Sequence, residues 1–181
     1  MQHTLINDYW KIWVHMIPVG ETSFSFAAVR AFSRLSHVWL TFRAAGAKSS
    51  SFICPTAIVG NELAAPVLSN IAPTARLSIG PKNYPDVQPS ASVPELFYQF
   101  QKAVHGVPNI NRDDFLKRAF TLVFDLRKVP GDPTSAISTR SGDLLRIDLQ
   151  HLSGAAPLEC WMTLFFFSVV AIRESGVTLL S

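Results

Sequence analysis

Histidine has the broadest chemical repertoire of the residues in this sequence, because imidazole binds metal ions and transfers protons near neutral pH. Successive histidines are at least twelve residues apart, so the chain has no local pair of the kind that zinc sites use. We therefore predict no metal ion, no cofactor and no catalytic residues. Where a histidine lies in an apolar segment, we expect a hydrogen-bonded structural role, as at His15 and His37. The five histidines are His3, His15, His37, His105 and His151.

Other motifs of catalytic chemistry are incomplete. Gly46 precedes Lys48 by two residues, but no upstream glycine completes a phosphate-binding loop, so we interpret this stretch as a polar loop. No G-x-S-x-G nucleophile elbow occurs. Cys54 and Cys160 lie in apolar surroundings far apart in sequence, which favours two buried free thiols over a disulfide.

Two aspartates occupy otherwise apolar segments that are typical of strands. A buried carboxylate needs a cationic partner, because desolvation of an unpaired charge is costly. For Asp125 and Asp148 we expect structural ion pairs rather than catalytic acids. Their partners are expected among the nearby arginines Arg127, Arg140 and Arg146.

The composition indicates a globular chain with an unusually uncharged surface. Of 181 residues, 48% are hydrophobic and only 16% are charged, which leads us to expect one domain, residues 1–181, with an interface. The net charge of +3 comes from scattered residues without a basic run, so we expect no specific nucleic-acid binding. Asp8 and Lys11 interrupt the region where a signal peptide needs its apolar core, which predicts a non-secreted protein.

The stretch LECWMTLFFFSVVAIRES, residues 158–175, holds thirteen uncharged residues between Glu159 and Arg173. As a helix it would reach about 20 Å, short of the roughly 30 Å core of a bilayer, so we expect no membrane span. Its aromatic and β-branched residues favour a strand. Alternation divides it into two largely apolar faces, so we expect both to be covered. One face holds Trp161, Thr163, Phe165, Phe167 and Val169, and the other holds Met162, Leu164, Phe166, Ser168 and Val170.

Six further segments have the apolar alternation or continuity of strands, separated by clusters of Gly, Pro, Ser and Asn. Seven or eight strands indicate a sandwich. In the segment 144–152 we expect Leu145, Ile147, Leu149 and His151 to face one way, and the alternate residues to form a wet face. The six segments are 9–17, 24–32, 37–44, 75–80, 119–126 and 144–152.

Two short helices are predicted from their start signals. SVPE, from Ser92, fits a capping box with proline in the first turn, and it precedes apolar residues at helical spacing. The second helix starts at Asn111, where Asp113 and Asp114 suit the positive end of the helix dipole. Between these elements, residues 48–73 and 81–92 are expected to be long loops at the ends of the sandwich.

The C-terminal part of the sequence resembles the closing segment of double jelly-roll major capsid proteins of large DNA viruses and virus-like transposons. The resemblance rests on a helix NRDDFLKRAF, a strand TLVFDLRKVP, then SGDLLRIDLQHL and the long apolar strand LECWMTLFFFSVVAIRES. The upstream YPDVQPSASVPELFYQFQKAV resembles the helix-bearing insertion of that family, so that the resemblance covers roughly residues 84–174. The family has two jelly rolls in tandem, whereas this chain has room for one.

The resemblance implies an all-β fold, a single eight-stranded antiparallel jelly-roll sandwich with two short helices, and no enzymatic activity. It also implies self-association into a homotrimer or larger assembly, in a virion or inside the cell. Together with the apolar strand faces, it leads us to expect interface residues at Trp161, Phe165, Phe166, Phe167 and Trp39. One alternative is a lectin-like binding module that uses the end loops, with Phe52 and Tyr84 as possible contacts. An enzyme with a histidine metal site on the same scaffold is the other alternative.

Overall fold

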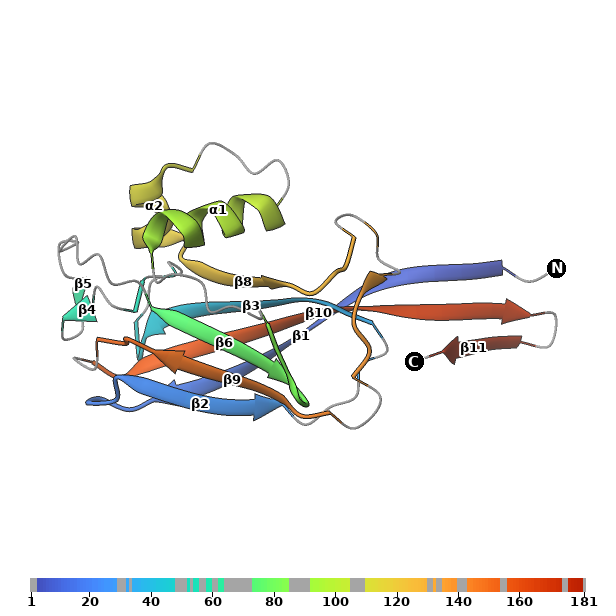
Figure 1. Ribbon diagram of the computed structural model, residues 1–181, viewed down its shortest axis with the longest axis horizontal. Coiled ribbons are helices and arrows are strands. Elements are labelled where there is room, and N and C mark those ends of the chain that lie inside the picture. The colour runs from blue at the N-terminus through green and yellow to red at the C-terminus, as the bar shows by residue number, and fades with distance from the viewer. Residues whose placement is uncertain are drawn as a thin grey trace.

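The computed structural model describes residues 3–28, 32, 34–47, 52, 54–55, 58–59, 62–63, 73–84, 92–104, 110–129, 132, 135–139, 143–153, 156–173 and 176–180. As the sequence indicates, strands lie at both ends of the chain and two helices lie in its middle (Figure 1). In chain order they are β1 (His3–Ile17), β2 (Ser23–Ala28), β3 (Leu35–Ala44), β4 (Ile58–Val59), β5 (Glu62–Leu63), β6 (Thr74–Ile79), β7 (Lys82–Tyr84), α1 (Val93–Ala103), α2 (Arg112–Arg118), β8 (Thr121–Asp125), β9 (Leu145–Gln150), β10 (Leu158–Arg173) and β11 (Gly176–Leu180).

Nine of the described strands form two antiparallel sheets that pack face to face. Sheet A has the order β1-β10-β3-β8, with β11 paired to β10, and sheet B has the order β2-β9-β6-β7. Most connections between successive strands of the sandwich cross from one sheet to the other, except that β6 and β7 share sheet B and β10 and β11 share sheet A. The late strands β9 and β10 enter the middle of each sheet. This is the double Greek key of a jelly roll, so the predicted fold class is confirmed. A further hairpin joins β4 and β5.

The core lies between the sheets, where each strand contributes its alternate residues. In β9, Leu145, Ile147 and Leu149 are buried while Arg146 and Gln150 are exposed. In β10, Cys160, Met162 and Leu164 are fully buried, and they face Phe42, Leu40 and Val38 of β3. The period-two pattern read from the sequence thus corresponds to one face in the core and one face outside it.

The helices lie beside β8 at one side of the sandwich, with β1 at the opposite edge of sheet A (Figure 1). A chain of aromatic rings connects them to the core: Phe97 and Phe100 each contact Phe115 at 5.2 and 5.1 Å between centroids, and Phe115 contacts Phe120 at 5.3 Å. Such ring contacts add to the burial of apolar area. The helix pair therefore covers the β8 edge of the sandwich.

Beyond the sandwich, β1 and β10 continue side by side, and β11 folds back along β10 (Figure 1). The register of β1 on β10 runs without interruption from His3 opposite Ile172 to Ile17 opposite Leu158. The pairing of β10 with β3 has an irregularity between Phe165 and Phe166. Strands β1 and β10 are thus much longer than the strands of the opposite sheet B.

The start of the second helix is confirmed in detail, whereas that of the first is confirmed only in position. The Asn111 side chain accepts a hydrogen bond from the Asp114 backbone N–H at 2.8 Å. Ser92 occupies the N-cap position of α1, and Pro94 lies in the first turn, but the Ser92 side chain makes no capping hydrogen bond. The prediction of a capping box is therefore wrong about the side-chain hydrogen bond of Ser92.

Two other expectations about elements need correction. His151 does not share the buried face of β9, because the strand ends at Gln150 and His151 is exposed with a positive φ of 61°. Residues 82–84, expected within a loop, form β7 on β6. Of the strand expected over 24–32, the structure has β2 (Ser23–Ala28), and residues 29–31 lie outside the described residues. Among the described residues, no helix is long and apolar enough to cross a membrane.

Candidate assembly interface

The outward face of sheet A carries three of the five residues predicted to form an interface. Because Cys160, Met162 and Leu164 face the core, the alternate residues Trp161 and Phe165 of β10 face outward. The register places Phe165 opposite His37 of β3. It also places Thr163, which lies between Trp161 and Phe165 in β10, opposite Trp39 of β3. These outward side chains are half-buried. We call this surface the A face.

The A face continues onto β1 as a row of exposed apolar side chains. Trp10 lies opposite Phe165, Ile12 opposite Thr163 and Val14 opposite Trp161, so the row shares the outward side. Globular proteins expose single apolar residues often, but contiguous apolar patches mark interaction sites. The members of this β1 row and their exposed fractions are Trp10 63%, Ile12 42%, Val14 49% and Met16 55%.

Side-chain contacts fix the middle of the A face. The rings of Trp39 and Phe165 are 4.9 Å apart, and the Arg43 guanidinium lies 5.7 Å from the centre of the Trp161 ring. Trp161 Nε1 donates a hydrogen bond to Glu159 Oε2 at 3.2 Å. The aromatic rings are thereby held in place before any partner binds, which reduces the entropy lost on association.

An ion pair borders the A face at its β8 side. Arg127 donates to both carboxylate oxygens of Asp125, with Nε–Oδ1 at 2.9 Å and Nη2–Oδ2 at 2.8 Å. His37 Nε2 lies 3.7 Å from Asp125 Oδ1, and His37 Nδ1 is 3.1 Å from Ser36 Oγ. Partial burial acts to raise the pKa of Asp125, but the hydrogen bonds from Arg127 and the neighbouring positive charges outweigh it and lower that pKa. The polar border suits the rim of an interface.

Phe166 differs from the residues of the A face. Phe166 packs against the core, with its ring 5.0 Å from Phe32 and stacked 5.9 Å from Tyr9. Phe167 is half-buried, and its backbone N–H donates to the Arg34 carbonyl at 2.9 Å. The three consecutive phenylalanines therefore do not form one surface, since Phe165 faces outward while Phe166 contacts the core.

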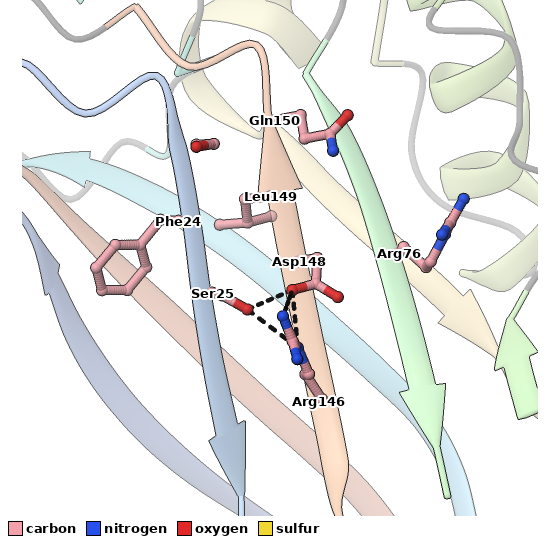
Figure 2. Close-up of a pocket in the computed structure, with 8 residues that line it drawn as sticks. Phe24, Ser25, Arg76, Arg146, Asp148, Leu149 and Gln150 are labelled. Atoms are coloured by element: carbon pink, nitrogen blue, oxygen red, sulfur yellow. Dashed lines mark hydrogen bonds and ion pairs between the residues drawn. The ribbon is translucent and has the colours of Figure 1, made fainter. Parts of the chain in front are cut away.

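The outward face of sheet B is polar. Arg146 Nε donates to Asp148 Oδ1 at 2.9 Å and to Ser25 Oγ at 3.2 Å, and the Ser25 hydroxyl donates to the same carboxylate oxygen (Figure 2). These groups line an open hollow of about 440 Å³ together with Arg76 and Gln150. We call this surface the B face. Its side chains satisfy one another in contact with water, so it has no evident need of a partner.

The expected ion pairs are confirmed, although neither carboxylate is deeply buried. Asp125 pairs with Arg127 and Asp148 pairs with Arg146, each across two residues of one segment. The two cysteines, Cys54 and Cys160, are buried and free, and burial raises the pKa of the Cys160 thiol to about 12. Both are confirmed as buried free thiols, as the sequence favoured.

Of the two histidines expected to be hydrogen-bonded structural residues, His37 agrees with the expectation and His15 does not. His37 makes the hydrogen bond expected of it, whereas His15 has a buried Nε2 without a partner and instead stacks on Phe26 at 4.2 Å. Burial lowers the pKa of His15. In the parts of the chain that the structure describes, no group of three or more His, Cys, Asp or Glu residues is placed to hold a metal.

The alternative binding module falls largely outside the described residues. Of the loops 48–73 and 81–92, the structure describes Phe52, Cys54, Pro55, Pro73, Pro81, Ser92 and the short strands β4, β5 and β7. Phe52 is half-buried and bridges to Ala119, and Tyr84 is half-buried in β7 opposite Leu77. Neither described aromatic residue is an exposed platform.

Sequence reasoning missed the β1 row as a unit, although it identified the segment as a strand. The signal was present: in YWKIWVHMI every second residue from Trp10 to Met16 is apolar, while Lys11 and His15 lie on the other parity. The sequence does not show which of the two sets of alternate residues is exposed, because Trp13 and Ile17, on the same side as Lys11 and His15, are apolar too. Only the sheet order shows that β1 is an edge strand with an apolar outward side.

Sequence comparisons give no match: no family model matches the chain, and no curated protein matches it. Solved structures do match. The chain superposes on VP54 of the virus PBCV-1, fitted into a reconstruction of the virophage Sputnik, at 9% identity and TM-score 0.58, covering 100% of this chain and 52% of that one. In a quasi-atomic model of the PBCV-1 capsid the values are 8% and 0.58, with the same coverage. A chain of the Sputnik virophage matches at 10% and 0.51, with 97% of this chain and 38% of that one covered.

These likenesses show the fold. At 8–10% identity they confirm that the chain is built like one jelly roll of virus capsid proteins, as the sequence resemblance led us to expect. The chain spans about half the length of the PBCV-1 chains that it matches.

Proposed function

We propose that this protein is a structural, capsid-like jelly-roll subunit without catalytic activity, which assembles with copies of itself into a homotrimer or a larger particle. The single observation that carries the proposal is the contrast between a polar B face and an apolar A face on the same sandwich. Contact of a contiguous apolar sheet face with water is unfavourable, so burial of that face between subunits favours association. The fold shared with virus capsid proteins supports the same conclusion.

The A face has the composition expected of an interface. Its middle is aromatic, with Trp161, Phe165 and Trp39, and its border carries Asp125 and Arg127. Interfaces commonly combine aromatic residues at the centre with a polar rim, and tryptophan is enriched among the residues that dominate binding energy. Trp161, Phe165 and Trp39 are therefore proposed as contact residues between subunits.

Phe166 and Phe167 have a different part in the proposal. Phe166 supports the fold beneath the A face through its contacts with Phe32 and Tyr9. Phe167 lies where β10 leaves the sandwich, and it is proposed to contribute to an interface at that end. The whole chain is proposed to act as one jelly-roll domain, located in a virion or virus-like particle.

The test is the size of the purified protein. Sedimentation velocity at micromolar concentration, followed by negative-stain electron microscopy, should show a trimer or larger species of regular shape. Substitution of Phe165 by Asp should reduce that size while circular dichroism and thermal unfolding stay close to those of the wild type. A wild-type protein that is a monomer at every salt concentration tested would contradict the proposal.

A matched control comes from the B face. Ser23→Asp places a charge at an exposed outward position of the opposite sheet, opposite Gln150, where no assembly contact is proposed. This variant should assemble like the wild type. If Ser23→Asp and Phe165→Asp reduce the size equally, the A face is not the specific interface.

A further inference from the structure

Strand β1 is the longest edge strand of the two sheets in the described structure. Edge strands expose unpaired backbone N–H and C=O groups, and proteins usually shield them by shortness, by charge or by a covering element. Here β8 is covered by the helices, β7 has three residues including Lys82, and β2 carries Ser23 and Ser25 outward. By contrast, β1 is 15 residues long.

The sequence of β1 adds an apolar side chain to nearly every exposed position along that edge. Between Tyr9 and Ile17 the only residue with a permanent charge is Lys11. The β1 row, defined above as Trp10, Ile12, Val14 and Met16, accounts for four of the nine large hydrophobic residues that are exposed in the described structure. Backbone groups that need hydrogen bonds and side chains that favour burial thus coincide on one strand.

We propose that β1 pairs antiparallel with β1 of a second copy of this chain, so that sheet A continues across a two-fold axis into its partner. The proposal rests on the proposed self-assembly and specifies one of its contacts. An isologous contact requires a surface complementary to itself, and an apolar strand edge meets that condition. A charged edge would select a partner of opposite charge, but β1 offers no such pattern.

The geometry of the pair restricts its register. In an antiparallel pair, directly opposite side chains lie on the same face of the sheet. With the two-fold axis perpendicular to the sheet, outward residues must therefore meet outward residues, and the β1 row of one copy meets the β1 row of the other. A register centred on Lys11 would place two lysines opposite each other and is disfavoured. We place the centre at Ile12, Val14 or the position between them.

The resulting contact extends the A face rather than replacing it. Each β1 row adjoins Trp161 and Phe165 of its own subunit, so that two paired copies present a continuous apolar surface of double width. A two-fold edge contact closes on itself and yields only a dimer. Together with the separate contact proposed on the A face, it would connect oligomers into a larger layer.

Single-cysteine variants at the four positions of the β1 row test the pairing. The native thiols of Cys54 and Cys160 are buried, so the wild-type chain gives the background. In a symmetric antiparallel pair, moving the cysteine by two residues along β1 changes the separation between the two thiols by four residues. This is about 13 Å at roughly 3.3 Å per residue. With a short bis-maleimide, self-crosslinking should be strongest at Ile12→Cys or Val14→Cys and at least fivefold weaker at Trp10→Cys or Met16→Cys.

The control lies outside the strand. Leu144→Cys is 45% exposed, similar to Ile12 and Val14, and precedes β9 on the other sheet. It should give only the crosslinking expected from random collision, with a yield that falls on dilution. Circular dichroism of each variant checks that the fold is retained.

Several outcomes overturn the edge pairing. Equal yields at all four positions, a maximum at Trp10 or Met16, or yields no higher than that of Leu144→Cys would do so, even if the wild type forms particles and the proposed function stands. Crosslinks that form only when a different protein is added would show that the partner is not a second copy. A wild type that is monomeric throughout would overturn both this inference and the proposed function.

Discussion

The two outward faces of the sandwich belong to sheets of the same fold and similar strand pattern, yet they differ in chemistry. The B face pairs Arg146 with Asp148 and Ser25 in contact with water. The A face holds Trp161, Phe165 and the β1 row, with Arg43 and Glu159 in contact with Trp161 and the Asp125–Arg127 pair at its border. This difference in chemistry is the reason why we propose contact between subunits at the A face and not at the B face.

The largest expected effect separates the core side of β10 from its outward side. Phe166→Asp places a charge against Phe32 and Tyr9 and should lower the free energy of unfolding by about 3 kcal/mol or prevent folding. Phe165→Asp should change it far less but should abolish the largest assemblies. Denaturant unfolding and sedimentation of both variants measure the contrast. Equal loss of stability in both would show that Phe165 is also a core residue.

The next prediction compares the edge strands of the two sheets. Trp10→Lys adds a charge to the apolar edge of sheet A, whereas Ala27→Lys adds one to an exposed position on the edge of sheet B. Trp10→Lys should shift the weight-average mass toward the monomer and raise solubility, while Ala27→Lys should leave the mass unchanged. Light scattering across a dilution series measures this. A loss of assembly with Ala27→Lys alone would reverse the roles assigned to the sheets.

A smaller effect concerns the ion pair at the border of the A face. Because the folded state lowers the pKa of Asp125, the ionised carboxylate stabilises the fold above the ordinary Asp value of 3.8, and this contribution is lost as pH falls through the lower folded pKa. Asp125→Asn should cost on the order of 1 kcal/mol at neutral pH. Its stability should also vary less with pH in the acid range, as denaturant titrations at several pH values would show. An unchanged acid profile would exclude a role for this pair in stability.

The smallest effect belongs to His15, on the inward side of β1. Its pKa is lowered by burial, so the unfolded state binds more protons once pH falls below 6.5, and stability should decrease from there down through the folded pKa. His15→Leu keeps the contact with Phe26 and should flatten the stability profile in that window. Thermal unfolding between pH 5 and pH 8 compares the two proteins. An identical slope in the variant would assign the pH dependence to another group.

Much of the fold could be predicted from the sequence, because alternation and start signals are local. The long strand at residues 158–173, the helix at Asn111 and the pairing of Asp148 with Arg146 all depend on neighbours within a few positions. Strand β7 has three residues, too few for a period to be visible. His151 was misplaced since its positive φ ends the alternation, and alternation alone does not indicate where a strand stops.

The candidate site could be predicted only in part, because an apolar face does not reveal which way it points. Both faces of β10 are apolar, and its orientation follows from the register that sets Met162 beside Leu40. The exposure of Trp10 follows from the position of β1 at the edge of sheet A. Sheet order is a long-range property, so a sequence that identifies each strand still leaves the interface unassigned.

The placement of β9 and β10 at the centres of their sheets has a consequence for biosynthesis. Strand β10 lies between β1 and β3, and β9 lies between β2 and β6. Each of these central strands is therefore later in the chain than both of the strands that it pairs with. While the ribosome is still making the segment after residue 144, β1 and β3 have been released without the strand that separates them. Contacts of such long sequence separation form slowly, and exposed apolar strands aggregate while they wait. Productive yield should therefore depend on chaperone supply during translation more than on the stability of the finished sandwich.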